Sequence, residues 1–168
     1  MKIRIFLISL IVISSLHGIA QINSTVDDPK SKNEILIGYC NIEGLQKGDY
    51  GTHFNNHYNV YEPSKASIKK LERKLDNVEI TIVLGTWCSD SKREVPRFYK
   101  VLDDAGYNDS LVKVIAVTRD KKAVFFDIDN LDIKRVPTFI IYENGEEIGR
   151  IIETPKKSLE KDLEKIVK

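Results

Sequence analysis

The sequence predicts an α/β fold with a central mixed sheet flanked by helices, and two patterns support this prediction. Short runs rich in β-branched residues alternate with longer segments whose apolar residues recur at helical spacing. Near the end of the chain, Asn144-Gly145 separates two strand-like runs, which is typical of an antiparallel hairpin. The composition agrees, because 42% of the 168 residues are hydrophobic and 30% are charged, as in one globular domain with a modest extension.

After a first helix, the predicted elements follow one another in the order β-α-β-α and then β-β-α. Strands are expected at residues 78–84, 112–117, 138–142 and 147–152. Helices are expected to run from Pro63-Ser64 to Asn77, from 89 to about 105 and over 121–133, and to begin again at Thr154-Pro155. Because the first strands are apolar along almost their whole length, we expect helices on both faces of the sheet.

The first twenty residues predict a secretory signal peptide. Lys2 and Arg4 precede an apolar run over 5–16, and Ala20 places a small residue at the cleavage position. The apolar run is shorter than a helix that spans a bilayer; an uncleaved anchor is the alternative. Cleavage after Ala20 predicts a periplasmic or secreted protein, where disulfides persist. No cysteine follows the cleavage position, so no lipid anchor is expected.

Residues 21–60 are expected to form a leader and an N-terminal extension ahead of the main domain, which is assigned to 61–168. The segment 21–34 is polar and charged, which predicts a flexible leader. The segment 35–60 is expected to hold short elements that pack on the main domain. Within it, Gly51 and Asn55-Asn56 argue against a helix.

Charge and cysteine content exclude several classes of protein. The net charge of +1 gives no electrostatic signature of nucleic-acid binding. The two cysteines, Cys40 and Cys88, cannot form a dense disulfide framework or a four-cysteine zinc site. His53 and His57 could join Cys40 as metal ligands, but a fourth ligand is lacking. We therefore expect neither a metal nor a bound cofactor.

Cys88 lies where a buried strand ends and a helix is expected to begin. A helix N-terminus presents free N–H groups and the positive end of the helix dipole, which favour a thiolate over a thiol. Lys92 and Arg93 add positive charge, whereas Asp90 opposes it. Position alone leaves two interpretations of Cys88 open, a reactive thiolate and an inert packed residue.

The segment around Cys88 resembles the active site of the thioredoxin family, whose motif is Trp-Cys-x-x-Cys-Lys with a proline eight residues after the first cysteine. Trp87, Cys88, Lys92 and Pro96 match this spacing. Downstream, the segment 133–145 resembles the family's Ile-x-x-x-Pro-Thr strand and its Asn-Gly hairpin. The resemblance covers about residues 64–167 and implies a thioredoxin-like fold.

By this resemblance, Cys88 is the nucleophile, Lys92 contributes charge and Trp87 shapes an apolar rim. Pro137 would be a cis-proline that faces Cys88. Together with its neighbours it would form the edge that docks an extended substrate peptide. The residues expected in that edge are Val136, Pro137 and Thr138.

Two departures from the family pattern bear on the chemistry. Ser91 replaces the second cysteine, giving Cys-x-x-Ser, and Ile82 stands where many members carry a buried acid. The Ser91 hydroxyl can stabilise a Cys88 thiolate by hydrogen bonding, but it cannot resolve a mixed disulfide.

Three outcomes follow for such a site. An external thiol or a membrane reductase could release the adduct, giving monothiol oxidoreductase or isomerase activity on a protein substrate that bears a disulfide or thiol. Cys40 could act as the resolving thiol. Alternatively, the site no longer turns over and the chain is a module that binds a protein or peptide partner. We favour the first outcome, because the rest of the motif is present in one sequence.

Overall fold

The computed structural model describes residues 22–167, so the expected signal peptide lies outside the described residues. The strands are β1 (Ser24–Asp27), β2 (Glu34–Cys40), β3 (Val78–Leu84), β4 (Val112–Ala116), β5 (Thr138–Glu143) and β6 (Glu146–Ile152). The α-helices are α1 (Ile42–Leu45), α2 (Gly48–Val60), α3 (Lys65–Leu71), α4 (Ser89–Asp104) and α5 (Leu159–Ile166). Two short 3₁₀ turns are η1 (Asp109–Leu111) and η2 (Asp129–Leu131).

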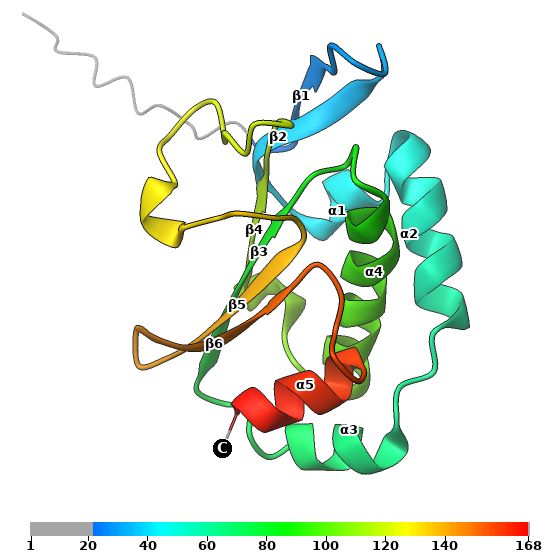
Figure 1. Cartoon of the computed structure of the whole chain (residues 1–168). Helices are drawn as coiled ribbons and strands as arrows, with labels where there is room; N and C mark the ends of the chain where they lie inside the picture. The colour runs from blue at the N-terminus through cyan, green and yellow to red at the C-terminus, as the bar shows by residue number, and fades with distance from the viewer. Residues whose placement is uncertain (1–21, 168) are drawn as a thin grey trace, which may run out of the picture.

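The strands form one mixed sheet in the order β1-β2-β4-β3-β5-β6 (Figure 1). β3 and β4 are parallel, and every other neighbouring pair is antiparallel. The central strand β3 pairs Ile82 with Val114 on one side and with Phe139 on the other. Ile82 is fully buried, as expected for an apolar run covered on both faces. The fold class is therefore the predicted α/β arrangement, a mixed sheet flanked by helices.

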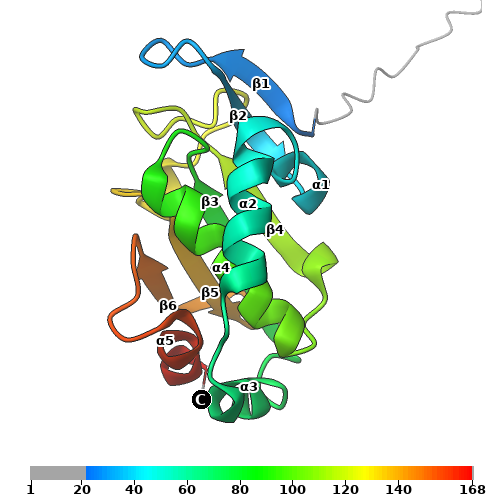
Figure 2. The ribbon, with the colours of Figure 1, turned by 90° about the vertical axis from the view of Figure 1, so that its right-hand side faces the viewer.

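All five α-helices contribute buried residues to the core on one face of the sheet. Figures 1 and 2 show them gathered on that face, with α2 lying along α4. Phe98 of α4 packs on Phe139 of β5 with ring centroids 4.4 Å apart. The opposite face is covered by the segment between β4 and β5, which buries Ile128 and Val136 against the sheet.

The helix predicted over 121–133 does not form, so the prediction of helices on both faces is wrong in that respect. Lys121 and Val124 have positive φ angles of 62° and 70°, which a right-handed helix cannot contain. The carboxylate of Asp127 accepts a hydrogen bond from the Asp129 amide at 2.7 Å, a local bond that competes with helix formation. Only the short turn η2 remains.

The expected flexible leader over 21–34 is also wrong, because β1 pairs with β2 in an antiparallel hairpin. The following segment holds α2, which is 13 residues long, despite the helix-breaking signal of Gly51. That glycine is required where it lies, because a Cβ there would approach the Gln46 carbonyl oxygen to 2.2 Å. α2 packs on α4, with Phe54 and Tyr99 ring centroids 5.6 Å apart.

Two helix boundaries differ from those predicted. α3 ends at Leu71, ahead of Asn77. α5 begins at Leu159 after the N-cap Ser158, not at Thr154-Pro155. Glu153, the residue directly after β6, has a φ of 58°, and its amide donates a hydrogen bond to the Pro137 carbonyl at 2.7 Å. The chain therefore leaves β6 in a turn, and the helix starts only after this turn. Among residues 22–167, no helix is both long and apolar enough to cross a membrane.

Candidate active site

Cys88 is the N-cap residue of α4, at the turn that follows β3. Its amide donates to the Gly85 carbonyl at 2.9 Å, which closes this turn. The side chain is partly exposed, and its Sγ donates to the Val136 carbonyl oxygen at 3.3 Å. The thiol therefore combines access from solvent with a position at the positive end of a 16-residue helix.

The segment facing Cys88 is the start of β5. The peptide bond between Val136 and Pro137 is cis, and the Val136 carbonyl points to the Cys88 sulfur. Thr138 is buried, and its hydroxyl donates to the Arg135 carbonyl at 2.7 Å. The structure thus brings Cys88 together with the segment 136–138, as the sequence resemblance implied.

Ser91 is fully buried one turn into α4. Its hydroxyl oxygen accepts from the Gly85 amide at 3.3 Å. Its carbonyl accepts a hydrogen bond from the hydroxyl of Tyr50 at 2.9 Å. Tyr50 is a buried residue of α2, and burial raises its pKa well above the usual value, so it stays a neutral donor. These bonds tie the first turn of α4 to both the strand end and the extension.

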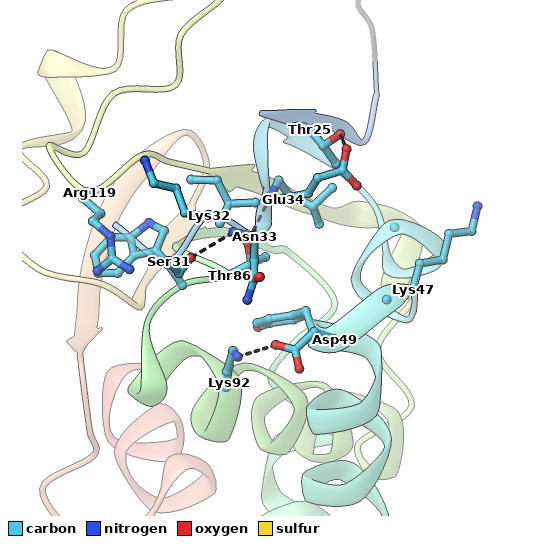
Figure 3. Close-up of a pocket in the computed structure, with 16 residues that line it drawn as sticks. Thr25, Ser31, Lys32, Asn33, Glu34, Lys47, Asp49, Thr86, Lys92 and Arg119 are labelled. Atoms are coloured by element: carbon cyan, nitrogen blue, oxygen red, sulfur yellow. Dashed lines mark hydrogen bonds and ion pairs between the residues drawn. The ribbon is translucent and has the colours of Figure 1, made fainter. Parts of the chain in front are cut away.

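Lys92 turns toward α2 and forms an ion pair with Asp49 at 2.6 Å (Figure 3). The lysine holds the pKa of the Asp49 carboxyl below its usual value, by hydrogen bonding and by charge. The Lys92 ammonium group is therefore paired with a carboxylate of the N-terminal extension. Sequence reasoning missed Asp49, because nothing local to residue 49 marks it as a partner of residue 92.

Trp87 is fixed by three contacts beside Cys88. The indole Nε1 donates to the Val117 carbonyl at 2.9 Å. The ring lies against Gly85, where a Cβ would approach its Cε2 atom to 2.5 Å. The guanidinium of Arg119 lies 4.8 Å from the ring centroid, a cation–π contact.

Arg119 is held in turn by Asp28, from the turn of the β1–β2 hairpin. Two guanidinium nitrogens each donate to a different Asp28 oxygen at 2.8 Å. Asp28 is fully buried. Hydrogen bonds from Arg119, and to a smaller extent from Ser31, hold the pKa of its carboxyl well below the usual range. Sequence reasoning placed Asp28 in a flexible leader and so missed it, and it missed Arg119 as well.

A cleft of about 590 Å³ opens beside this group (Figure 3). Its walls come from the β1–β2 hairpin, from the α1–α2 region and from the turn that carries Thr86 and Trp87. The charged residues that line it are Lys32, Glu34, Lys47, Asp49, Lys92 and Arg119. The N-terminal extension therefore forms one wall of the cleft beside Trp87. Its hairpin is joined to the turn before Cys88 by a hydrogen bond that the Leu36 amide donates to Thr86 Oγ1 at 3.1 Å.

Cys40 lies apart from this group. It is buried in β2 within the core on the helix-covered face, whereas Cys88 packs against the core on the opposite face. Burial raises the pKa of the Cys40 thiol to about 12. Both cysteines are free.

The histidine pair of α2 does not gather metal ligands. Within the described range 22–167, no cluster of three or more histidine, cysteine, aspartate or glutamate side chains could hold a metal ion. His53 instead lies 3.9 Å from Asp49.

Comparison with known proteins places these features in a family. A family model described as thioredoxin matches residues 43–164, well over half of the chain. No curated protein matches the sequence.

Several solved structures are similar to parts of the chain. A protein of unknown function from Pseudomonas aeruginosa is 12% identical, with 66% of this chain and 65% of that one covered and a TM-score of 0.45. The chain thus spans just under two thirds of that protein's length. Oxidised mitochondrial thioredoxin 3 from Saccharomyces cerevisiae is 19% identical, with coverage of 66% and 96% and a TM-score of 0.38. Thioredoxin f from spinach chloroplast is 19% identical, with coverage of 69% and 90% and a TM-score of 0.36. All three TM-scores are below 0.5.

Proposed function

Because the chain belongs to the thioredoxin family, we propose that it carries out thiol–disulfide exchange through Cys88 alone, as a monothiol oxidoreductase or isomerase. The observation that supports this most is the placement of Cys88. It is a partly exposed thiol at the N-cap of α4, 3.3 Å from the Val136 carbonyl, with a serine at the second motif position. Such a thiol can attack a disulfide, and the serine cannot complete the local second step.

In the proposed first step, the Cys88 thiolate attacks one sulfur of a substrate disulfide. The substrate S–S bond breaks as the Cys88–substrate S–S bond forms, and the other substrate sulfur leaves as a thiolate that takes up a proton. In isomerisation, a different substrate thiolate then attacks the bonded substrate sulfur. A new substrate disulfide forms, Cys88 leaves as a thiolate, and no net oxidation or reduction occurs.

In reduction, two equivalents of an external thiol are consumed. The first attacks Cys88 Sγ, releases the substrate thiolate and leaves Cys88 bonded to the external sulfur. The second attacks that external sulfur, forms the external disulfide and returns the Cys88 thiolate. The two electrons gained by the substrate are those lost by the two external thiols. A membrane reductase could supply the same electrons.

An external resolving thiol fits the positions of the two cysteines better than Cys40 does. Cys40 is buried in the core on the helix-covered face, whereas Cys88 packs against the other hydrophobic cluster, which contains Val136. The Cys40 thiol pKa of about 12 leaves almost no thiolate near neutral pH, and the thiolate is the reactive form. We therefore assign Cys40 to core packing in this proposal.

The docking edge proposed for the substrate is the segment 136–138. A substrate peptide in extended conformation would lie along this edge with its sulfur directed at Cys88, which the Val136 carbonyl already faces. We place this activity in the periplasm or outside the cell, because the sequence of residues 1–20 predicts a cleavable signal peptide and disulfide-bearing substrates occur there.

The test is recovery of activity from scrambled ribonuclease in the presence of a small external thiol. We expect the wild type and Cys40→Ser to be active and Cys88→Ser to be inactive. Equal activity of Cys88→Ser and the wild type would refute the proposal. If the wild type shows no turnover and a partner protein is retained equally by Cys88→Ser, the chain is instead a binding module of the thioredoxin fold.

A further inference from the structure

We propose that the β1–β2 hairpin completes the active site, with Asp28 and Arg119 acting as positioning residues for Trp87 and Cys88. This inference rests on the proposed function, because it concerns the reactivity of Cys88. It adds a part of the molecule outside the residues that match the family, since the match begins at residue 43.

The Asp28 carboxylate accepts hydrogen bonds from two parts of the chain. It accepts hydrogen bonds from the Ser31 amide at 3.0 Å and from the Ser31 hydroxyl at 2.6 Å, which fix the turn of the hairpin. It also accepts both bonds of the Arg119 fork at 2.8 Å. A fully buried carboxylate must be paired in this way, so the hairpin and Arg119 hold each other in place.

Arg119 carries this constraint to the active site. It belongs to the segment that directly follows β4 in the chain, and its guanidinium lies 4.8 Å from the centre of the Trp87 ring. The planar guanidinium suits both contacts, because it can form two parallel bonds to a carboxylate and also pack on an aromatic face. Val117, two residues before Arg119, accepts the indole N–H at 2.9 Å. The segment 117–119 thus contacts Trp87 by both its backbone and a side chain.

These contacts affect the position of Cys88, because Cys88 directly follows Trp87 in the chain. The pKa of Arg119 is raised mainly by Asp28, and the Cys88 thiolate makes a smaller Coulombic contribution. The Arg119 guanidinium packs on the ring of the residue directly before Cys88, so Asp28, Arg119 and Trp87 together hold the turn that carries the thiol. The other charged groups on the first turn of α4 are Asp90, Lys92 and Arg93, and each has an ion-pair partner of its own. Arg119 is paired as well, and because its partner Asp28 belongs to the β1–β2 hairpin, the hairpin fixes its position.

The experiment compares Asp28→Asn, Arg119→Gln and the double variant with the wild type. Trp87 is the single tryptophan of the chain, so its fluorescence reports its surroundings without interference. The alkylation rate of Cys88 by iodoacetamide as a function of pH, followed by mass spectrometry, reports the thiol pKa. Glu147→Gln is the matched control, because it breaks another two-bond arginine pair, Arg150–Glu147, in the β6 region.

We expect each single variant to change the emission of Trp87 and to slow the alkylation of Cys88 at pH 7 by up to about tenfold, because Trp87 and the turn that carries the thiol are no longer held in place. The double variant should match Arg119→Gln alone, because Asp28 acts through Arg119. Arg119→Lys, which keeps the charge but not the fork, should recover part of the rate. The control should behave as the wild type.

Three results would overturn the inference. One is that Asp28→Asn slows alkylation as much in the Arg119→Gln background as in the wild type. Another is that neither residue affects Trp87 emission or the alkylation rate. The third is that Asp28→Asn accelerates alkylation, which would mean that the carboxylate opposes the thiolate without positioning Arg119.

Two further comparisons keep the test decisive. If Asp28→Asn does not fold, Arg119→Gln against Arg119→Lys supplies the same comparison, with equal rates counting against the inference. Inactivity of the wild type on scrambled ribonuclease would contradict the proposed function, and the emission of Trp87 would still decide the positioning claim.

Discussion

Replacing Gly85 by alanine should disrupt the active site through Trp87. The new Cβ would lie 2.5 Å from Cε2 and 2.6 Å from Nε1 of the indole, whereas carbon atoms in contact normally stay about 3.5–4.0 Å apart. The ring must therefore move by about 1 Å. The Nε1–Val117 hydrogen bond, now 2.9 Å, would then exceed the usual limit of about 3.2 Å.

The cost of Gly85→Ala can be worked from these contacts. Overpacking of a filled site costs about 1–3 kcal/mol, and a lost hydrogen bond adds about 1 kcal/mol. We expect the free energy of unfolding to fall by about 2–4 kcal/mol in urea titrations, together with a change in Trp87 emission.

The control for this substitution is Gly149→Ala, whose Cβ would meet the Ile166 side chain at 2.9 Å. It should lower stability without changing the emission of Trp87. A Gly85→Ala protein with the stability and the emission of the wild type would show that the indole does not depend on this glycine.

Three other predictions concern Cys40, Tyr50 and Asp28. Burial raises the pKa of the Cys40 thiol to about 12, so Cys40 should not react with Ellman's reagent at pH 8 in the folded protein. We expect one thiol to react in buffer and two in denaturant. Two rapidly reacting thiols in buffer would contradict the burial of Cys40. Tyr50→Phe removes the bond to the Ser91 carbonyl and should cost about 1 kcal/mol of stability without slowing Cys88 alkylation; an unchanged urea midpoint would show that the bond contributes nothing. The lowered pKa of Asp28, caused mainly by Arg119, means that its stabilising contribution is present above its unfolded-state pKa of about 4 and is lost as the pH falls below that value. The acid unfolding of Asp28→Asn should accordingly be less steep than that of the wild type, and equal slopes would count against the ion pair.

Local sequence patterns were sufficient to predict the centre of the fold. The β-branched run of β3 and the apolar spacing of α4 place both elements, because their own residues determine which faces are buried. The Asn144-Gly145 turn has φ angles of 53° and 79°, which these two residue types tolerate. The family resemblance then identified Cys88 and the segment 136–138 as neighbours, and the structure has them in contact.

The parts that could not be predicted depend on contacts between distant residues. Asp28 and Arg119 are 91 positions apart, and Tyr50 and Ser91 are 41 apart. No periodicity or capping pattern connects such pairs. The same limit explains why α2 was not predicted. Gly51 allows the helix to pack closely against Gln46, and this tertiary contact outweighs the low helix propensity of glycine.

The helix predicted over 121–133 is absent for a local reason. Side-chain hydrogen bonds such as the one that the Asp129 amide donates to the Asp127 carboxylate favour turns over helix. The residues that cover the second face of the sheet, Ile128 and Val136 among them, do so from irregular backbone.

The measurement that tests the central claim most directly is the fate of a mixed disulfide. The wild type, incubated with a peptide disulfide and no external thiol, should accumulate a covalent adduct at Cys88, visible by intact mass, because Ser91 cannot release it. Addition of a small thiol should then return free protein. An absence of adduct, or its spontaneous loss with formation of a Cys40–Cys88 disulfide, would contradict exchange through a single cysteine.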